Sequence, residues 1–399
     1  MTTLRCSYPA ANRGKVVVWG SIAASPFGGM IWQVLHHLAA IRSLGFDVWY
    51  VEDSDRPIYE PGSYEYTEDY SSNLRLVHQA LGHIGLADRW AIRSPVSDDV
   101  WFGSLKHSEM LQLYKDAAVA INLCGAQEVQ PSHHRIRCRV YLETDPVSSQ
   151  VAVAKGNTRL IEELDSYHYL FTYGENLGAP DCRVPMVRYS WHKTRPPVVV
   201  DWWTSSHALS PDAALTTVAS WSHEVKDTIW NGETWRWSKH FQFERFMDLP
   251  RRSSARLRVA LGAINSTDLR RLSEHGWETL PAQSLDDFLD YRRFIRESLG
   301  EFSPVKEQVM LPRSGWFSDR SVCYLAAGRP VIMQDTGFGK FVPTGEGLFA
   351  FAGEDDVVAA IDAVRSDFRR HSAAAAEIAR EYFSGDRLMA GILRTVGLL

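Results

Sequence analysis

The chain has 399 residues, with 43 basic and 48 acidic side chains and a net charge of −5. Hydrophobic residues make up 45% and charged residues 23% of it, a composition typical of globular proteins that excludes a disordered or fibrous chain. The acidic balance argues against a general binder of nucleic acid or anionic membrane, because such proteins need a strong cationic field. The length favours two domains.

Several features of the sequence indicate a cytoplasmic protein. No stretch reaches the ~18 uninterrupted apolar residues of a membrane span. The first 20 residues lead straight into a predicted strand, without the apolar region of a signal peptide. The cysteines are odd in number and lack CxxC spacing, which is typical of free thiols in a reducing compartment: Cys6, Cys124, Cys138, Cys182 and Cys323.

The start of the chain predicts a β-α-β unit. Residues 15–20 (KVVVWG) form a short β-branched run that ends in glycine, as a buried strand does. Apolar side chains then recur at helical spacing over 30–44, and Gly45 stands where a helix-ending glycine belongs. Residues 46–53 (FDVWYVED) form a second apolar strand. Such a unit predicts a parallel sheet covered by helices.

The loop at 21–29 lies where a dinucleotide-binding site would have its glycine-rich turn. Glu52 lies at the end of the second strand, as such a site requires, but Gly20, Gly28 and Gly29 do not have G-x-G-x-x-G spacing. We therefore disfavour a nicotinamide dinucleotide. We predict instead that the loop borders a cleft and that N–H groups near Gly28 and Gly29 face an acceptor or a phosphate.

Polar residues follow the next three predicted strands, at 117–125, 137–143 and 168–174. Ligands of open parallel sheets bind at the carboxyl ends of strands. We therefore expect six polar side chains to converge on one crevice: Asn122, Glu143, Asp145, Gln150, Glu175 and Asn176.

Residues 184–204 carry three prolines and lose helical periodicity, which indicates a connection between domains. Alternation of strands and helices resumes at 215–221 and 256–264. Tryptophans crowd this junction, and we favour packing over an aromatic platform for a sugar or base: Trp202, Trp203, Trp221, Trp230, Trp235 and Trp237.

The segment 303–353 carries the strongest functional signal. VMLP (309–312) is expected to end a strand, RSGWF to form a turn, and Ser318 and Asp319 to begin a helix that stops at Gly328. A turn that opens onto a helix N-terminus offers free N–H groups and the positive end of the helix dipole, so it can bind a pyrophosphate without a metal ion.

Charged and polar side chains flank this turn. Arg313 and Arg320 are expected to add bidentate phosphate contacts. Asp335 and Thr336 lie on the loop after the next strand, where they are expected to hold hydroxyl groups of a bound sugar.

The run G-W-F-S at 315–318, followed by A-A-G-R-P-V-I and D-T-G-F, resembles the donor-binding signature of GT-B-fold, nucleotide-sugar-dependent glycosyltransferases. Residues 28–53 are similar to their first loop, helix and strand, which face the acceptor. The resemblance implies an α/β fold of two Rossmann-like domains facing a cleft. It divides the chain into an acceptor domain (1–204), a donor domain (205–383) and a C-terminal helix (384–399) that packs back on the first domain.

The resemblance also implies roles for residues. Ser318 matches the serine that contacts the donor phosphates, and donor binding is expected from Arg313, Ser314, Gly315, Trp316, Phe317, Ser318, Asp319, Arg320, Asp335, Thr336 and Gly337. Two features depart from the family pattern. The pair of glutamates that many retaining members carry is replaced by Gly315 and Cys323, and the loop at 21–29 lacks the histidine base of many inverting members.

Glycosyl transfer requires that the acceptor hydroxyl lose its proton and that the leaving diphosphate be stabilised. Asp145 is the first candidate for the base and Glu175 the second, although each also fits a structural role in a turn or a helix cap.

Lys239 and Lys306 are candidate partners of the diphosphate, although most lysines are solvated. Asp53 begins a D-x-D pattern, but it lies far from the donor motif and is interpreted as part of a solvated loop.

We therefore predict a glycosyltransferase, transferring a hexose or a deoxysugar, that needs neither a metal ion nor a tightly bound cofactor. Its co-substrate is a nucleoside-diphosphate sugar, and its acceptor is a hydroxyl-bearing small molecule. The Tyr- and Trp-rich first half favours a flat apolar acceptor such as a secondary metabolite. Neither a nucleic acid nor a membrane is an expected partner. The alternatives are a sugar-nucleotide epimerase or hydrolase of the same fold, and a non-catalytic donor-binding partner protein.

Overall fold

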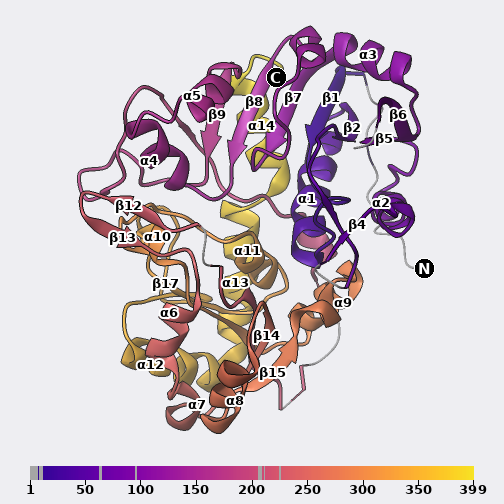
Figure 1. Ribbon diagram of the computed structural model, residues 1–399. Coiled ribbons are helices and arrows are strands. Elements are labelled where there is room, and N and C mark those ends of the chain that lie inside the picture. The colour runs from indigo at the N-terminus through magenta and orange to yellow at the C-terminus, as the bar shows by residue number, and fades with distance from the viewer. Residues whose placement is uncertain are drawn as a thin grey trace.

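A computed structural model describes residues 8, 12–62, 65–94, 97–204, 209–210, 212–223 and 226–399. Two parallel sheets, one in each half of the chain, dominate the molecule (Figure 1). Cys6 and the start of the predicted second domain, 205–208, lie outside the described residues. No helix of the described part is long and apolar enough to cross a membrane.

The first sheet has the strand order β10-β9-β8-β7-β1-β2-β5-β6, parallel except for β6 at one edge. Its strands are β1 (Lys15–Trp19), β2 (Asp47–Glu52), β5 (Trp90–Ser94), β6 (Ser97–Gly103), β7 (Ala117–Leu123), β8 (Arg139–Glu143), β9 (Tyr169–Thr172) and β10 (His192–Lys193). The helices of this half are α1 (Gly28–Ser43), α2 (Ser71–His83), α3 (His107–Asp116), α4 (Ser148–Ala154) and α5 (Thr158–Asp165). A small hairpin joins β3 (Ile58–Tyr59) to β4 (Tyr66–Thr67).

The second sheet has the order β15-β14-β11-β16-β17-β18, with every pair parallel. Its strands are β11 (Leu215–Ser220), β14 (Leu257–Gly262), β15 (Glu278–Pro281), β16 (Gly300–Ser303), β17 (Val331–Gln334) and β18 (Leu348–Phe351). Its helices are α6 (His240–Phe243), α7 (Leu249–Arg252), α8 (Ser266–Glu274), α9 (Phe288–Arg296), α10 (Glu307–Met310), α11 (Asp319–Ala326), α12 (Glu354–Ser366) and α13 (Phe368–Tyr382). A hairpin of β12 (Thr228–Trp230) and β13 (Glu233–Trp235) stands apart from the sheet.

One expected element is wrong. Val309 and Met310 of VMLP lie in the short helix α10, and the strand of this region is β16, six residues earlier in the chain. A short apolar run has the same local pattern in a buried strand and a buried helical turn, so its sequence does not distinguish the two.

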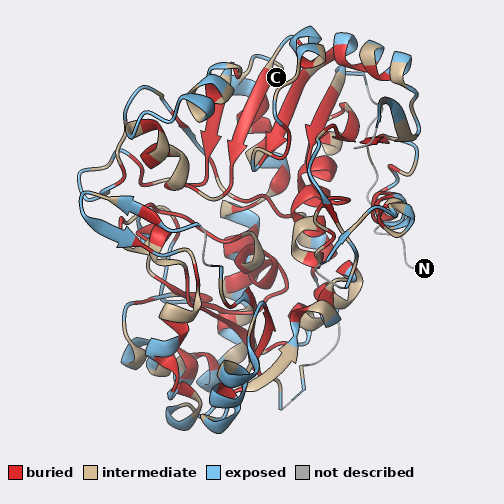
Figure 2. Cartoon of the chain, in the orientation of Figure 1, coloured by how far each residue is buried: buried red, intermediate tan, exposed pale blue. Residues whose placement is uncertain are grey.

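The two halves share a hydrophobic core. Figure 2 shows buried strands and helices inside both halves. Trp32 of α1 donates from its indole nitrogen to the carbonyl oxygen of Phe288 in α9, at 2.6 Å. Trp202 and Trp203 pack against the ring of Trp32, with centroids 6.0 and 4.9 Å away. The packing interpretation therefore holds for these junction tryptophans.

The chain ends beside the first half (Figure 1). Helix α14 (Gly385–Thr395) packs against α1, and Ser43 donates a hydrogen bond of 2.6 Å to Asp386. A Cβ on Gly385 would lie 2.9 Å from the Cβ of Ala40, so the glycine permits this close approach. The last helix thus ties the two halves together.

Candidate functional site

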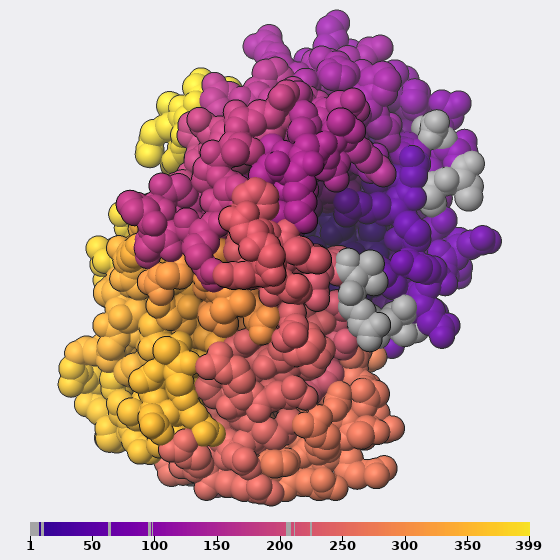
Figure 3. Space-filling view, turned by 60° about the vertical axis from the view of Figure 1, so that its left-hand side comes forward, coloured from indigo at the N-terminus to yellow at the C-terminus, as the bar shows by residue number. Residues whose placement is uncertain are grey.

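A cleft of about 510 Å³ lies between the two halves, at the carboxyl ends of strands from both sheets. Figure 3 shows the surface hollowed where the first, indigo part of the chain meets the salmon part. The first half contributes the loop before α1, the first turns of α1, and Cys124, Thr144 and Asp145 after β7 and β8. The second half contributes the end of β11, Lys306 in the segment after β16, and the start of α11.

Gly28 and Gly29 line this cleft at the start of α1. A Cβ on Gly28 would lie 2.5 Å from the carbonyl oxygen of Leu285 and 2.9 Å from the Cβ of Tyr291, both in the second half. Only glycine therefore lets α1 approach the second half this closely. The two glycines thus have a packing role that the sequence pattern alone did not indicate.

Four of the predicted donor residues line the cleft: Trp316, Ser318, Asp319 and Arg320. The indole nitrogen of Trp316 donates to the carbonyl oxygen of Thr144 at 2.8 Å, which connects the two halves. Ser318 is the N-cap residue of α11, and its side chain makes no capping hydrogen bond. The hydroxyl at the predicted phosphate-binding turn is thus not used to close the helix.

Arg320 is held by the second half through all three guanidinium nitrogens. Its Nε donates to Glu301 at 2.5 Å, and the other two nitrogens donate to Ser303 at 2.9 Å and to the carbonyl oxygen of Val218 at 2.5 Å. Arg320 therefore orders the floor of the cleft, and these three hydrogen bonds leave two of its five N–H donors for a ligand.

The other predicted donor residues lie behind the turn and do not line the cleft. Arg313 pairs with Asp181 at 3.0 Å and with Asp335 at 3.2 Å. The hydroxyl of Thr336 donates to the carbonyl oxygen of Trp316 at 2.7 Å. The same region behind the turn includes Ser314, Gly315, Phe317 and Gly337. Gly315 has φ +76° and packs on the backbone of Asn176.

The two candidate bases lie in different surroundings. Asp145 lines the cleft with 42% of its side chain exposed, and Lys306 donates to it at 3.0 Å. Glu175 does not line the cleft, and its carboxylate accepts from the Nε of Arg195 at 2.7 Å. Burial raises the pKa of Glu175, although the adjacent Arg195 opposes the rise. The structure thus brings Asp145, and not Glu175, to the cleft.

Two lysines that sequence reasoning treated as mostly solvated face the cleft. Within the described residues, the side chain of Lys239 has no hydrogen bond or ion pair. Burial together with Arg320 and Lys306 lowers its pKa well below the ordinary value, although Glu301 and Asp145 oppose this. The Nζ of Lys306 lies 3.3 Å from the ring centroid of Trp237. The cleft therefore holds a cationic cluster of Lys239, Lys306 and Arg320.

Asp319 is the first residue of α11 and lines the same cleft. Burial, and then repulsion from Asp145, raises the pKa of Asp319 to about 7, while a hydrogen bond with Gln33 opposes this rise. A carboxyl group in the cleft thus changes charge near neutral pH.

The prediction that the D-x-D pattern lies in a solvated loop is wrong for its first residue, Asp53, which is buried. Asp53 is 2% exposed and accepts from Arg93 at 2.5 Å, from Tyr114 at 2.7 Å and from His133 at 2.8 Å. These partners lie 40 to 80 residues further along the chain, so the local sequence carried no sign of them. Among the described residues, no three of the types His, Cys, Asp and Glu form a metal-binding group.

Two of the six polar residues expected in one crevice line hollows of this region: Glu143 and Asp145. Gln150 donates to Glu143 at 2.8 Å, and Asn122 donates to the carbonyl oxygen of Gln127 at 2.7 Å. Asn176 donates to the carbonyl oxygen of Arg313 at 2.8 Å. Gln33, His36 and Tyr291 also line the cleft, which the sequence did not predict. Each lies within a helix, where local spacing does not distinguish a residue of a cleft from one of the core or the surface.

No family model matches the chain, and no curated protein is similar to it in sequence. Solved structures do match its fold. HepE of Anabaena, in complex with UDP-glucose, has a TM-score of 0.56 and 11% identity, with 97% of this chain and 100% of HepE covered. TarM has a TM-score of 0.60 and 8% identity, with 97% and 99% covered.

The sucrose-phosphate synthase of Thermosynechococcus elongatus is also similar, with a TM-score of 0.55, 11% identity and coverage of 96% and 99%. At these identities the likeness concerns the fold. It extends over almost the whole chain and includes both parallel sheets. The predicted fold class, α/β of GT-B type, is therefore confirmed, and the two parallel sheets are consistent with two Rossmann-like domains.

Proposed function

We propose that the chain is a glycosyltransferase that binds a nucleoside-diphosphate sugar in the cleft between its halves. The donor carries a hexose or a deoxysugar, and the acceptor is a hydroxyl-bearing small molecule. Solved structures of the same fold include HepE in complex with UDP-glucose and with UDP, which supports a nucleotide-sugar donor.

The cationic cluster is the observation that carries this proposal. Lys239 is a buried amine without an ion pair within the described residues, and its lowered pKa shows that its charged form is costly there, although Glu301 and Asp145 oppose the lowering. An anion beside Lys239 would favour the charged form. The start of α11 adds free N–H groups and the positive end of a helix dipole. A diphosphate satisfies both features.

The chemistry follows from this placement of the donor. The bond between the anomeric carbon and the diphosphate oxygen breaks, and the electron pair leaves on the diphosphate, where Lys239 and Lys306 stabilise it. The acceptor oxygen forms the new bond to the anomeric carbon, and its proton passes to Asp145, the carboxylate that is open to the cleft. Arg320 and Glu301 keep the floor of the cleft in place.

Calorimetry with the diphosphates of uridine, guanosine, adenosine and thymidine tests the donor site. We expect one of them to bind, and Lys239→Ala to weaken its binding about ten- to a hundredfold, because a hydrogen bond to a charged group contributes about 1.5–3 kcal/mol. Lys115→Ala, at an exposed position of α3, is the matched control and is expected to bind like the unchanged chain. Failure of all four diphosphates to bind would refute the proposal.

Turnover separates a transferase from a binding protein. Asp145→Asn is expected to reduce sugar transfer at least a hundredfold, since a positioned base contributes roughly 10²–10⁴ to the rate. Glu175→Gln, whose carboxylate is paired with Arg195 outside the cleft, is expected to reduce it less than tenfold. The reverse order of these two effects would make Glu175 the base and Asp145 a turn residue.

A further inference from the structure

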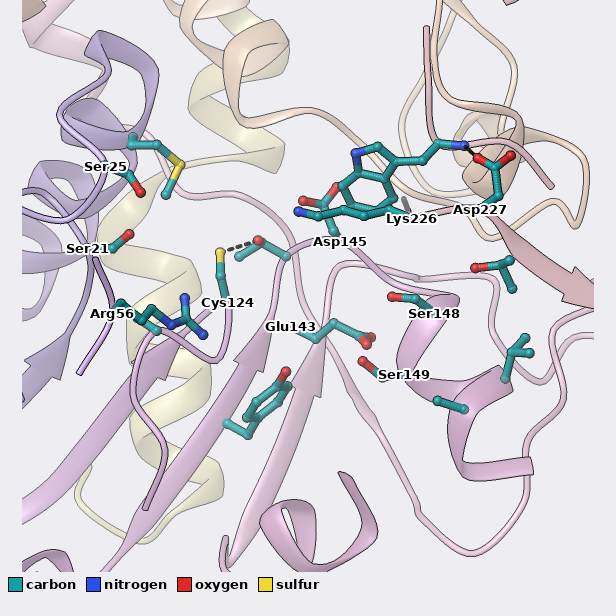
Figure 4. A pocket seen from close by; sticks show the side chains of 18 of the residues that line it. Ser21, Ser25, Arg56, Cys124, Glu143, Asp145, Ser148, Ser149, Lys226 and Asp227 are labelled. Carbon is teal, nitrogen blue, oxygen red and sulfur yellow. Dashed lines mark hydrogen bonds between the residues drawn. The ribbon is translucent and has the colours of Figure 1, made fainter. Parts of the chain in front are cut away.

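A second pocket of about 600 Å³ adjoins the cleft on the side of the first sheet (Figure 4). Cys124, Thr144, Asp145 and Trp237 line both hollows. The remaining walls come from the loop before α1, the start of α4 and the hairpin of β12. A molecule in this pocket therefore lies beside the carboxylate that faces the proposed donor.

Glu143, the last residue of β8, points into this pocket (Figure 4). Its side chain is buried, with the residue 2% exposed. One carboxylate oxygen, Oε2, accepts from Gln150 at 2.8 Å and from Thr172 at 2.7 Å. The other oxygen, Oε1, is also buried and has no well-formed hydrogen bond within the described structure, and the hydroxyl of Ser149 is the donor beside this carboxyl.

An unpartnered buried oxygen is costly, because it has lost its water without gaining a donor. Gln150 and Thr172 hold the carboxylate from the protein side, so the free oxygen cannot turn away to find another partner. A hydroxyl group brought by a ligand would donate to Oε1 and remove this cost.

The pocket has further polar side chains beside apolar ones. Hydroxyl groups of Ser21, Ser25, Ser148 and Ser149 face the hollow, with the last two beside Glu143 (Figure 4). Charged groups of the lining are Arg56, Lys155, Lys226 and Asp227, and apolar surface comes from Met30, Tyr141, Val151, Ile229 and Trp237. Each hydroxyl of a sugar both donates and accepts, and a sugar ring also has an apolar face, so a carbohydrate satisfies both parts of the lining. A flat apolar molecule would leave the serine hydroxyls and the carboxylate of Glu143 unpaired.

We propose that this pocket binds a carbohydrate as the acceptor, with Glu143 accepting a hydrogen bond from one of its hydroxyl groups. The inference rests on the proposed function, because the pocket is an acceptor site only if the neighbouring cleft holds the donor. Glu143 binds a hydroxyl group other than the reacting one, whose proton passes to Asp145. The acceptor class therefore differs from the flat apolar molecule that the aromatic content favoured.

The test compares two sets of acceptors with the unchanged chain. UDP-glucose, GDP-mannose, ADP-glucose and dTDP-glucose serve as donors, and diphosphate release and product mass are measured. Methyl glucosides, galactosides and mannosides, maltose and sucrose are expected to raise diphosphate release above hydrolysis and to gain one sugar. Planar phenols such as flavonoids are expected to do neither.

Two failures are distinguishable in this experiment. If no diphosphate binds in calorimetry, the donor site itself is refuted, and the acceptor proposal fails with it. If a donor binds and is hydrolysed but no carbohydrate gains a sugar, or only phenols do, the acceptor proposal alone is overturned.

Variants then test Glu143. Glu143→Gln is expected to raise the KM for the carbohydrate at least tenfold, while the affinity for the diphosphate stays within twofold. Glu163→Gln, a carboxylate of the same half that bonds Tyr167 outside the pocket, is the matched control. A parallel loss of diphosphate affinity in Glu143→Gln would show a merely structural role and overturn the assignment.

If Glu143→Gln does not fold, Ser149→Ala tests the same wall of the pocket. Its KM for the carbohydrate is expected to rise severalfold, because one hydroxyl partner is lost. An unchanged KM in Ser149→Ala would overturn the proposal that the sugar lies against this wall.

Discussion

The charged side chains of the cleft differ in their ion pairs and in the direction in which burial shifts their pKa values. Arg320 is neutralised by Glu301, and Lys306 is shared between Asp145 and the ring of Trp237. Of these three basic side chains, only Lys239 forms no ion pair within the described residues, and burial lowers its pKa. The cleft thus holds a basic group without an ion-pair partner, together with Asp319, whose pKa burial raises to about 7.

This arrangement predicts that diphosphate binding depends on pH. An anion beside Asp319 raises the pKa of this carboxyl above about 7, so binding takes up a proton and weakens as the pH rises through that range. Calorimetry between about pH 6 and about pH 8 is expected to show a severalfold larger loss of affinity in the unchanged chain than in Asp319→Asn. Equal losses of affinity in the two chains would show that the charge of Asp319 does not affect diphosphate binding.

At the scale of elements, the site depends on where helices begin. Helix α1 starts against the second half, and α11 starts at the floor of the cleft. The loop before α1 is held by Glu52, whose carboxylate accepts from the backbone N–H groups of Ala23 at 2.6 Å and Ala24 at 3.0 Å. Burial raises the pKa of Glu52 to about 7.

Gly28→Ala tests the close approach of α1. The new Cβ would meet the carbonyl oxygen of Leu285 and the Cβ of Tyr291, so we expect the free energy of unfolding to fall by about 1–3 kcal/mol in urea denaturation. Gly391→Ala in α14 is the control, because nothing lies within 4 Å of that position. It is expected to stabilise the chain by roughly 0.5–1 kcal/mol through helix propensity. An unchanged stability in Gly28→Ala would contradict the packing described.

At the scale of the whole molecule, the two halves are joined by a shared core and by a chain that crosses between them twice. The chain leaves the first sheet after β10 and enters the second at β11, and α14 returns to the first half. A parallel bridge between Val198 and Ser384 pairs the two crossings. The two halves are therefore connected on the side where the chain crosses.

Removal of the last helix is expected to loosen this joint. A chain that ends at Phe383 lacks the buried side chains of Met389, Ile392 and Leu393, each of which contributes about 1.5–3 kcal/mol by burial. Its Tm is expected to fall by several degrees or more, and a chain that ends at Thr395 is the control. Identical melting of the shorter chain would show that α14 does not stabilise the first half.

Local patterns in the sequence determined much of the fold. The strands at 15–19 and 47–52, the helix between them and its end at Gly45, which has φ +87°, agree with the structure. The turn before α11 was also predictable, because glycine, proline and capping residues act over only a few positions.

Long-range pairing decided which of the predicted residues reach the cleft. Glu175 pairs with Arg195, Asp53 pairs with His133, and Arg313 pairs with Asp181, so none of them faces the ligand space. Lys239 and Glu143 gained importance for the opposite reason, since the fold buries an amine without an ion pair and an oxygen without a well-formed hydrogen bond. Periodicity and capping depend on neighbours in the chain, whereas burial and charge pairing depend on neighbours in space. The sequence therefore determined the first β-α-β unit, the start of α11 and, through its family resemblance, the fold class, but not the helical state of Val309 and Met310. Only the tertiary structure decided which side chains form the site.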